Sequence, residues 1–274
     1  MVRASHGERE VTLPIEWAFG SGDQGITFVS QLENERYVEY SFSWYTAIHS
    51  MALTAGQPGR EPASLSQAVG VIYDAFSVPA TITACFQCHS TGPVGLGDEF
   101  EIRPAELGVR CEACHGPGRQ HVSALEQGDV EQVRASITNP ASLPAERINE
   151  VCGACHRVPA AEGREFDFSN PWHVRHQPPY LSQSRCFLES GGALTCFTCH
   201  DPHEKLQRAA PEHYNIRCAG CHDGAAHPTL APGAAASPGD CIACHMPKVR
   251  PQPHLSFTNH WIGIYGDDTL RPRE

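Results

Sequence analysis

The residues of this 274-residue chain with the clearest chemistry are paired cysteines that are each followed by a histidine. Twelve of the thirteen cysteines form pairs with two residues between them, and a histidine follows each pair at once. The six copies are Cys85, Cys88 and His89; Cys111, Cys114 and His115; Cys152, Cys155 and His156; Cys196, Cys199 and His200; Cys218, Cys221 and His222; Cys241, Cys244 and His245.

This spacing is typical of covalent haem attachment. Two cysteines on one helical turn reach both vinyl groups of a haem and form thioethers, and the next side chain offers its imidazole to the iron. Zinc ribbons and disulfides are the alternatives, but neither requires a histidine directly behind every pair. The pattern therefore predicts six covalently attached haems c.

Composition and charge restrict the class of protein. The net charge of −11 argues against a nucleic-acid partner. The chain contains no run of 18 apolar residues, so no transmembrane segment is predicted. Its first residues also lack the apolar region of a signal peptide. Haem attachment takes place outside the cytoplasm, so we expect a periplasmic or extracellular protein whose numbering begins at a processed or truncated end.

The chain elements that must position these motifs are short. The chain has 24 Gly and 22 Pro, a composition typical of loops. We therefore expect a multihaem cytochrome c fold of mostly short helices and loops around a haem chain. Residues 26–32 and 37–45 predict a small N-terminal β element, with Val38, Tyr40, Phe42 and Trp44 on one face. Residues 120–136 and 142–151 predict helices, the first weakened by Gly128. We expect residues 1–80 to form a β-containing segment and residues 81–274 the hexahaem domain.

A haem iron bound by one histidine needs a sixth ligand, or it stays open to substrate. Ten histidines lie outside the motifs, whereas the chain has three methionines, and Met246 directly follows the haem-binding His245. Bis-histidine ligation is therefore expected, and it implies lower reduction potentials than His/Met ligation.

Five blocks of sequence resemble the cytochrome c-554/c-prime-like multihaem family over roughly residues 17–262. The blocks are CEACHGPGRQH (111–121), RHQPPYLSQSRCF (175–187), LTCFTCHDPH (194–203), CIACHMPK (241–248) and HLSFTNHWI (254–262). The resemblance implies haems stacked in close pairs that pass electrons along a chain.

The resemblance also implies that His121 and His203 bind irons of haems attached elsewhere. Further candidate ligands are His176, His254, His260 and His49, with His173, His213 and His227 in reserve. Relatives often carry a histidine after the N-terminal Gly-Ser-Gly, where this chain has Asp23 and Gln24. Either His49 takes that place, or one haem lacks a protein ligand or takes one from a neighbouring subunit.

Two classes of function fit these residues. An electron-transfer protein, which is not an enzyme, would pass electrons between redox partners, a donor and an acceptor. A multihaem oxidoreductase of a small nitrogen or sulfur compound would need one open haem. We favour the carrier, because no motif has lysine in place of its histidine. Whether copies assemble into an oligomer or filament stays open. The odd Cys186 is expected to be an inert thiol beside a haem, with an intermolecular disulfide as the alternative.

The haem load is directly testable. The intact mass of the exported protein should exceed the mass of the chain by six haems, and denaturation should release none, because thioethers are covalent. A colourless protein loaded with zinc would contradict this interpretation of the motifs.

Overall fold

The computed structural model describes residues 1–33, 35–57, 59, 61–74, 82–156, 166–208, 210–222 and 240–273. The chain forms two compact units. The first comprises Met1–Thr138 with Gln252–Leu255, and the second comprises Asn139–Pro251 with Ser256–Glu274. The first two motifs belong to the first unit and the other four to the second. The expected boundary between residues 80 and 81 falls outside the described residues and stays a prediction.

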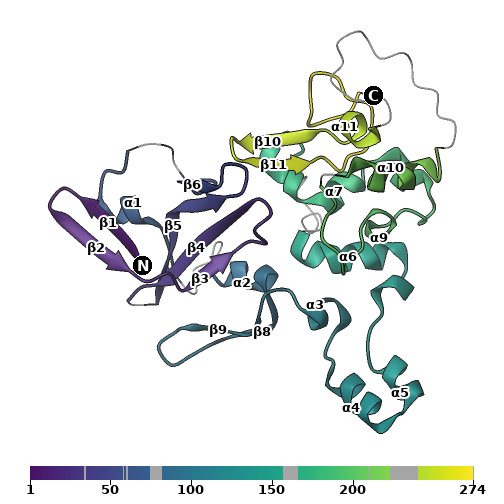
Figure 1. Ribbon diagram of the computed structural model, residues 1–274, viewed down its shortest axis with the longest axis horizontal. Coiled ribbons are helices and arrows are strands. Elements are labelled where there is room, and N and C mark those ends of the chain that lie inside the picture. The colour runs from purple at the N-terminus through teal and green to yellow at the C-terminus, as the bar shows by residue number, and fades with distance from the viewer. Residues whose placement is uncertain are drawn as a thin grey trace. The chain divides into compact units, whose positions relative to one another are not determined.

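Antiparallel strands build most of the first unit (Figure 1). A hairpin of β1 (Val2–His6) and β2 (Arg9–Leu13) comes first. A sheet follows in the order β3, β4, β5 and β6, and β7 also pairs with β5. These elements are β3 (Trp17–Phe19), β4 (Gly25–Gln31), β5 (Arg36–Tyr45), β6 (Ser50–Leu53), the short helix α1 (Leu65–Val69) and β7 (Gly70–Asp74). The predicted pairing of the segments 26–32 and 37–45 is present as β4 and β5.

Strand β5 is buried on both faces, whereas the sequence predicts one apolar face. Val38 and Tyr40, on the predicted face, are buried in a cluster with Val2 and Val69. Tyr37, on the opposite face, is fully buried in a second cluster that includes Phe86 of the first motif. The aromatic side chains of β5 therefore connect the sheet to the first motif.

A hairpin that the sequence analysis did not predict joins the first two motifs. Helix α2 (Thr83–His89) holds the first motif, and β8 (Ser90–Leu96) begins at the next residue. The paired strand β9 (Ile102–Leu107) leads to α3 (Cys111–His115), which is the second motif. The chain thus leaves one motif and reaches the next within one supersecondary unit.

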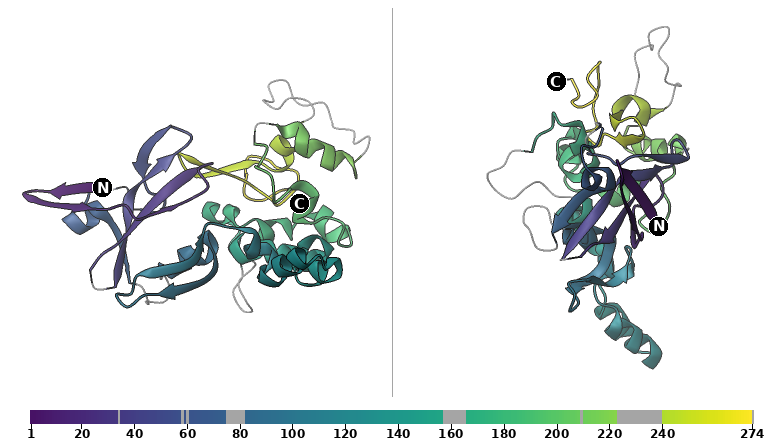
Figure 2. Two further views of the ribbon diagram at one scale, coloured as in Figure 1. Left: turned by 60° about the horizontal axis from the view of Figure 1, so that its bottom comes forward. Right: turned by 90° about the vertical axis from the view of Figure 1, so that its left-hand side faces the viewer.

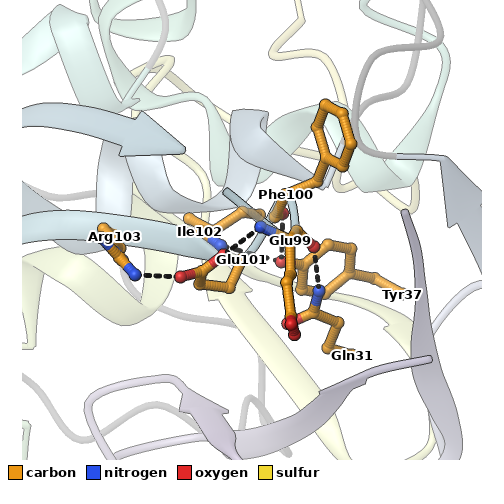
Figure 3. Close-up of polar contacts among 7 residues, drawn as sticks. All are labelled: Gln31, Tyr37, Glu99, Phe100, Glu101, Ile102 and Arg103. Carbon is orange, nitrogen blue, oxygen red and sulfur yellow. Dashed lines mark hydrogen bonds and ion pairs between the residues drawn. The ribbon is translucent and has the colours of Figure 1, made fainter. Parts of the chain in front are cut away.

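The hairpin end nearest its turn is anchored to β5 by the hydroxyl of Tyr37 (Figure 3). This hydroxyl donates to the carbonyl of Phe100 at 3.1 Å and accepts from the N–H of Ile102 at 2.9 Å. Gln31 adds a bond from its side-chain amide to the carbonyl of Glu99 at 3.1 Å. One buried side chain thus bonds to two backbone groups of the hairpin.

The helix expected over residues 120–136 is two helices. They are α4 (Arg119–Gln127) and α5 (Val130–Ala135), which lie side by side (Figure 2). Gly128 ends α4 with a φ of 72°, a left-handed conformation that glycine adopts without a steric penalty. Asp129 then caps α5 by accepting a hydrogen bond from the N–H of Gln132.

The second unit consists mostly of short helices. Its elements are η1 (Pro140–Ser142), α6 (Ala145–His156), η2 (Pro171–Arg175), α7 (Gln177–Leu181), α8 (Arg185–Glu189), α9 (Cys196–Cys199), α10 (Pro211–Ala219), α11 (Cys241–His245), β10 (Lys248–Gln252) and β11 (Leu255–Thr258). Helix α6 confirms the helix expected to run into Cys152. The core contains Val174, Tyr180 and Val249, surrounded by partly buried aromatic residues such as Phe166 and Trp261.

The expectation of short helices around a small β element is confirmed only in outline. The described residues contain eleven strands in four sheets, which is more β structure than the sequence analysis predicts. The additional strands include the β8–β9 and β10–β11 hairpins. In the described parts of the chain, no helix has the length and apolar character that a membrane span requires.

The anchor at Tyr37 yields a stability prediction. Tyr37→Phe removes the acceptor of the buried Ile102 N–H, which should cost about 1–3 kcal/mol. Hydrogen exchange at the Ile102 amide should accelerate accordingly. Gln31→Ala, which removes an exposed bond to the same hairpin, serves as the control and should change stability by about 0.5 kcal/mol or less. Unchanged exchange at Ile102 in the phenylalanine variant would contradict the anchor.

Candidate functional site

The first two motifs meet at the base of the β8–β9 hairpin. The N–H of Gly108 donates to the carbonyl of His89 at 3.1 Å. The hydroxyl of Thr91 donates to the carbonyl of Gly108 and accepts from the N–H of Arg110, both at 2.8 Å. Arg110 immediately precedes Cys111, so these bonds hold the start of the second motif against the end of the first.

A cavity of about 750 Å³ lies beside the second motif, and its exposed lining is mostly apolar. Cys111, His115 and His121 all line it, together with Val122. The family resemblance implies that His121 serves a haem attached elsewhere. The structure places its imidazole at the same cavity as that of His115.

The two histidines of this cavity are oriented by one segment of the chain. Nδ1 of His115 lies 2.8 Å from the carbonyl oxygen of Thr138, and Nδ1 of His121 lies 2.8 Å from that of Val133. A carbonyl can only accept a hydrogen bond, so each Nδ1 carries the proton when the ring is neutral. The Nε2 atoms then have the lone pair that binds a metal.

The same device recurs in the second unit. Nδ1 of His245 lies 2.8 Å from the carbonyl oxygen of Gly263, and Nδ1 of His156 lies 2.9 Å from the side-chain oxygen of Gln177. Metal-binding histidines commonly donate their other N–H in this way, which fixes the tautomer and the ring orientation. The motif spacing identifies both histidines, but no sequence pattern points to the oxygens that orient them.

His200 and His260 form the best-defined pair of imidazoles. Their ring centroids are 6.2 Å apart, with 36° between the ring planes. Nδ1 of His260 lies 2.9 Å from the carbonyl oxygen of Thr258. Nδ1 of His200 is buried and lacks a hydrogen-bond partner among the described residues. Desolvation lowers the pKa of both rings, that of His260 to about 4, so both are neutral at pH 7.

Buried polar side chains hold the loop that presents His260. Ser184 is fully buried, and its hydroxyl donates to the carbonyl of His260 at 3.1 Å and accepts from the N–H of Ile262 at 2.7 Å. Asn259 is also fully buried and bonds to the N–H of Trp261. Ser184 and Asn259 stand within blocks that carry the family resemblance, but no motif distinguishes them from other polar residues.

Two other candidate ligands have polar partners of their own. His176 is buried, its ring stacks 5.7 Å from that of His173, and its Nε2 accepts from Arg175 Nε–H at 3.3 Å. His203 follows Pro202 with a side chain that is 76% exposed, and its Nδ1 lies 3.4 Å from the Asp201 carboxylate.

His49 and His254 lie near the same tyrosine of the first unit. His49 is exposed in the turn that follows β5, with a φ of 46°. The ring of His254 lies 5.4 Å from that of Tyr45, the last residue of β5.

Among the motif histidines, the ring of His89 packs edge-on at 5.4 Å against Phe19, and His222 is exposed. The reserve His227 lies outside the described residues.

All thirteen cysteines lie in the described parts of the chain, and none of them forms a disulfide there. Cys186, the cysteine outside the motifs, is half-buried in α8, and burial raises the pKa of its thiol, which lowers its reactivity. Within the described ranges, no group of three or more His, Cys, Asp or Glu side chains lies close enough together to hold a metal ion.

Comparison with known sequences identifies relatives for this chain. The model of the family "Cytochrome c554 and c-prime" matches residues 40–116, which include the first two motifs. The chain is 25% identical over 193 residues to "Multiheme cytochrome MtrA" of Shewanella baltica (strain OS185), covering 64% of this chain and 55% of that protein. The chain therefore spans about half the length of this curated relative. The resemblance to multihaem c-type cytochromes that the sequence blocks indicate is confirmed.

Two solved structures also match, at 16% sequence identity each. The undecahaem cytochrome from the S-layer of Carboxydothermus ferrireducens has a TM-score of 0.42, with 78% of this chain and 36% of that chain covered. The outer cell wall cytochrome OcwA has a TM-score of 0.44, with 87% of this chain and 65% of that chain covered.

The residues present fit covalently bound haem c. The Cys-x-x-Cys-His turns supply two thiols and an imidazole, and an apolar cavity adjoins one of them. His115 and His245 are held in the tautomer that ligates through Nε2. Nδ1 of the buried His200 ring has no hydrogen-bond partner among the described protein groups.

Proposed function

Because this chain is a relative of the multihaem c-type cytochromes, we propose that it is a hexahaem electron carrier with bis-histidine irons. The observation that carries this proposal is the pair of His200 and His260, whose ring centroids lie 6.2 Å apart. Two imidazoles that bind one metal from opposite sides, at bonds of about 2 Å, place their centroids about 6 Å apart. If both rings hold one iron at this separation, that iron would be closed to substrate.

The protein groups at this pair favour a stable, electron-transferring site. Bound haem supplies reversible one-electron reduction of its iron. The low pKa of His260 keeps its ring unprotonated, and the bond to Thr258 fixes the ring orientation. Ser184 and Asn259 hold the backbone on either side of that ring, so little rearrangement accompanies a change of charge.

The other irons require further ligands, and we assign these to His49, His121, His176, His203 and His254. His121 has the strongest support, because its Nδ1 donates to Val133 and its ring faces the cavity beside Cys111. His115 lines the same cavity, which makes the second haem the one that His121 reaches most readily.

Redox proteins are the proposed partners, as donor and acceptor, and the proposed location is periplasmic or extracellular. Covalent haem attachment requires export, which supports this location. The net charge of −11 favours partners with basic docking surfaces, since complementary charge accelerates encounter. An oxidoreductase with one open haem is the competing function.

Removing His260 tests the assigned pair. His260→Ala should leave every haem attached but convert one from low spin to high spin, as seen in visible and electron paramagnetic resonance spectra. His260→Met should restore low spin and raise the potential of that haem, because a thioether favours the reduced iron. His6→Ala, at an exposed site in β1, is the control. An unchanged spectrum in the alanine variant would refute the assignment.

Carbon monoxide separates the carrier from the oxidoreductase. A fully bis-histidine protein should not respond to the gas when reduced, and it should turn over neither nitrite nor hydroxylamine. One open iron among six would shift about a sixth of the haem absorbance. His49→Ala should create such an open site while the wild type shows none. Binding in the wild type, together with turnover, would favour the oxidoreductase.

A further inference from the structure

Two helices of the second unit carry the same pattern ahead of their motifs. In α6 the residues are Glu146-Arg-Ile-Asn149-Glu-Val-Cys152, and in α10 they are Glu212-His-Tyr-Asn215-Ile-Arg-Cys218. The shared pattern is Glu, then Asn three residues later, then the first cysteine three residues after that. Residues three apart lie on one face of a helix, so each asparagine lies beside its own motif.

Each asparagine reaches the first cysteine of the following motif. Oδ1 of Asn149 accepts from the N–H of Cys196 at 3.4 Å and from its thiol at 3.0 Å. Oδ1 of Asn215 accepts from the N–H of Cys241 at 3.2 Å. The third motif is thereby bonded to the fourth, and the fifth to the sixth.

The first cysteines of each pair also contact one another. The thiols of Cys152 and Cys196 are near enough for each to shift the pKa of the other, and burial, together with the nearby Cys241, raises the pKa of the Cys218 thiol. The same arrangement thus occurs twice, although 44 residues separate the first pair of motifs and 23 the second. An accidental contact would not be expected to repeat with the same residue types.

The bonded N–H groups are ones that a helix cannot satisfy itself. Cys196 and Cys241 are the first residues of α9 and α11, and the first N–H groups of a helix have no acceptor within it. The capping residues Thr195 and Asp240 accept from the third residue of each helix instead. The asparagine of the preceding motif therefore supplies the missing acceptor.

We propose that Asn149 and Asn215 are positioning residues that join the last four haem sites into two equivalent pairs. This inference rests on the proposed haem attachment. Thioether formation removes the thiol donor of Cys196, but the N–H bonds of Cys196 and Cys241 persist. Each asparagine thus fixes where the next haem is anchored relative to its own, and thereby sets the electronic coupling within the pair.

The first two motifs lack this device. Three residues before Cys85 stands Ile82, which is buried in the apolar cluster around Tyr37, and three residues before Cys111 stands Gly108. The β8–β9 hairpin joins these motifs instead. Loss of an asparagine should therefore affect the second unit alone.

Circular dichroism in the Soret region tests the proposal, because two haems held close together give a coupled, two-signed band. Asn149→Leu and Asn215→Leu keep the branched shape of the side chain but remove the acceptor. Each should lower the amplitude of the band at full haem content by mass. The double variant should lose about the sum of the two losses, because the pairs are separate. Asn149→Asp keeps an acceptor oxygen and should retain most of the signal.

Asn139→Leu is the matched control, because Asn139 caps η1 in the same unit without bonding to a motif. It should leave the band unchanged. Three results would overturn the proposal: an unchanged band in the double leucine variant, an equal loss in the control, or loss of haem in place of loss of coupling. A wild-type protein without haem would instead refute the proposed function.

Discussion

The hydrogen bond from an imidazole Nδ1–H to an oxygen of the chain is the interaction on which the candidate sites depend. It occurs at His115, His121, His245 and His260 with main-chain carbonyls, and at His156 with Gln177. Because a neutral imidazole has one proton, donation from Nδ1 leaves Nε2 as the metal-binding atom. The acceptors lie in loops and neighbouring elements outside the motif helices, so the loop-rich composition has a direct role in orienting ligands.

The two units meet the same requirement with different scaffolds. Isolated helices as short as those that carry the motifs are marginal by themselves, so each motif must be held by contacts beyond its own helix. In the first unit a sheet does this, through Phe86 packed in the cluster around Tyr37 and through the hairpin that Tyr37 anchors. In the second unit the motif helices hold one another through Asn149 and Asn215, beside a core rich in aromatic side chains.

Local sequence patterns correctly predicted the elements that are specified by residues close together in the sequence. The β4–β5 pairing and helix α6 are confirmed. The alternation of apolar side chains that predicts the strands, and the signals that predict the start of the helix, each lie within about a dozen consecutive residues. The burial of Tyr37 was missed because it depends on α2, which is far along the chain. The single helix over 120–136 was wrong because Gly128 ends α4 in a left-handed conformation, where the sequence analysis treats it only as a weak point.

The sequence by itself determined the kind of cofactor and the residues proposed to attach it, because two thiols and an imidazole within five residues form a complete local site. Only the tertiary structure decided which imidazole faces which motif. His200 and His260 belong to different blocks of sequence, and they meet because Ser184 and Asn259 hold the loop of His260 in place. The pairing of the third motif with the fourth, across the longest gap between motifs, is of the same kind. Such contacts join residues that are far apart in the sequence. They depend on how the folded chain packs, which the spacing of motifs along the sequence does not specify.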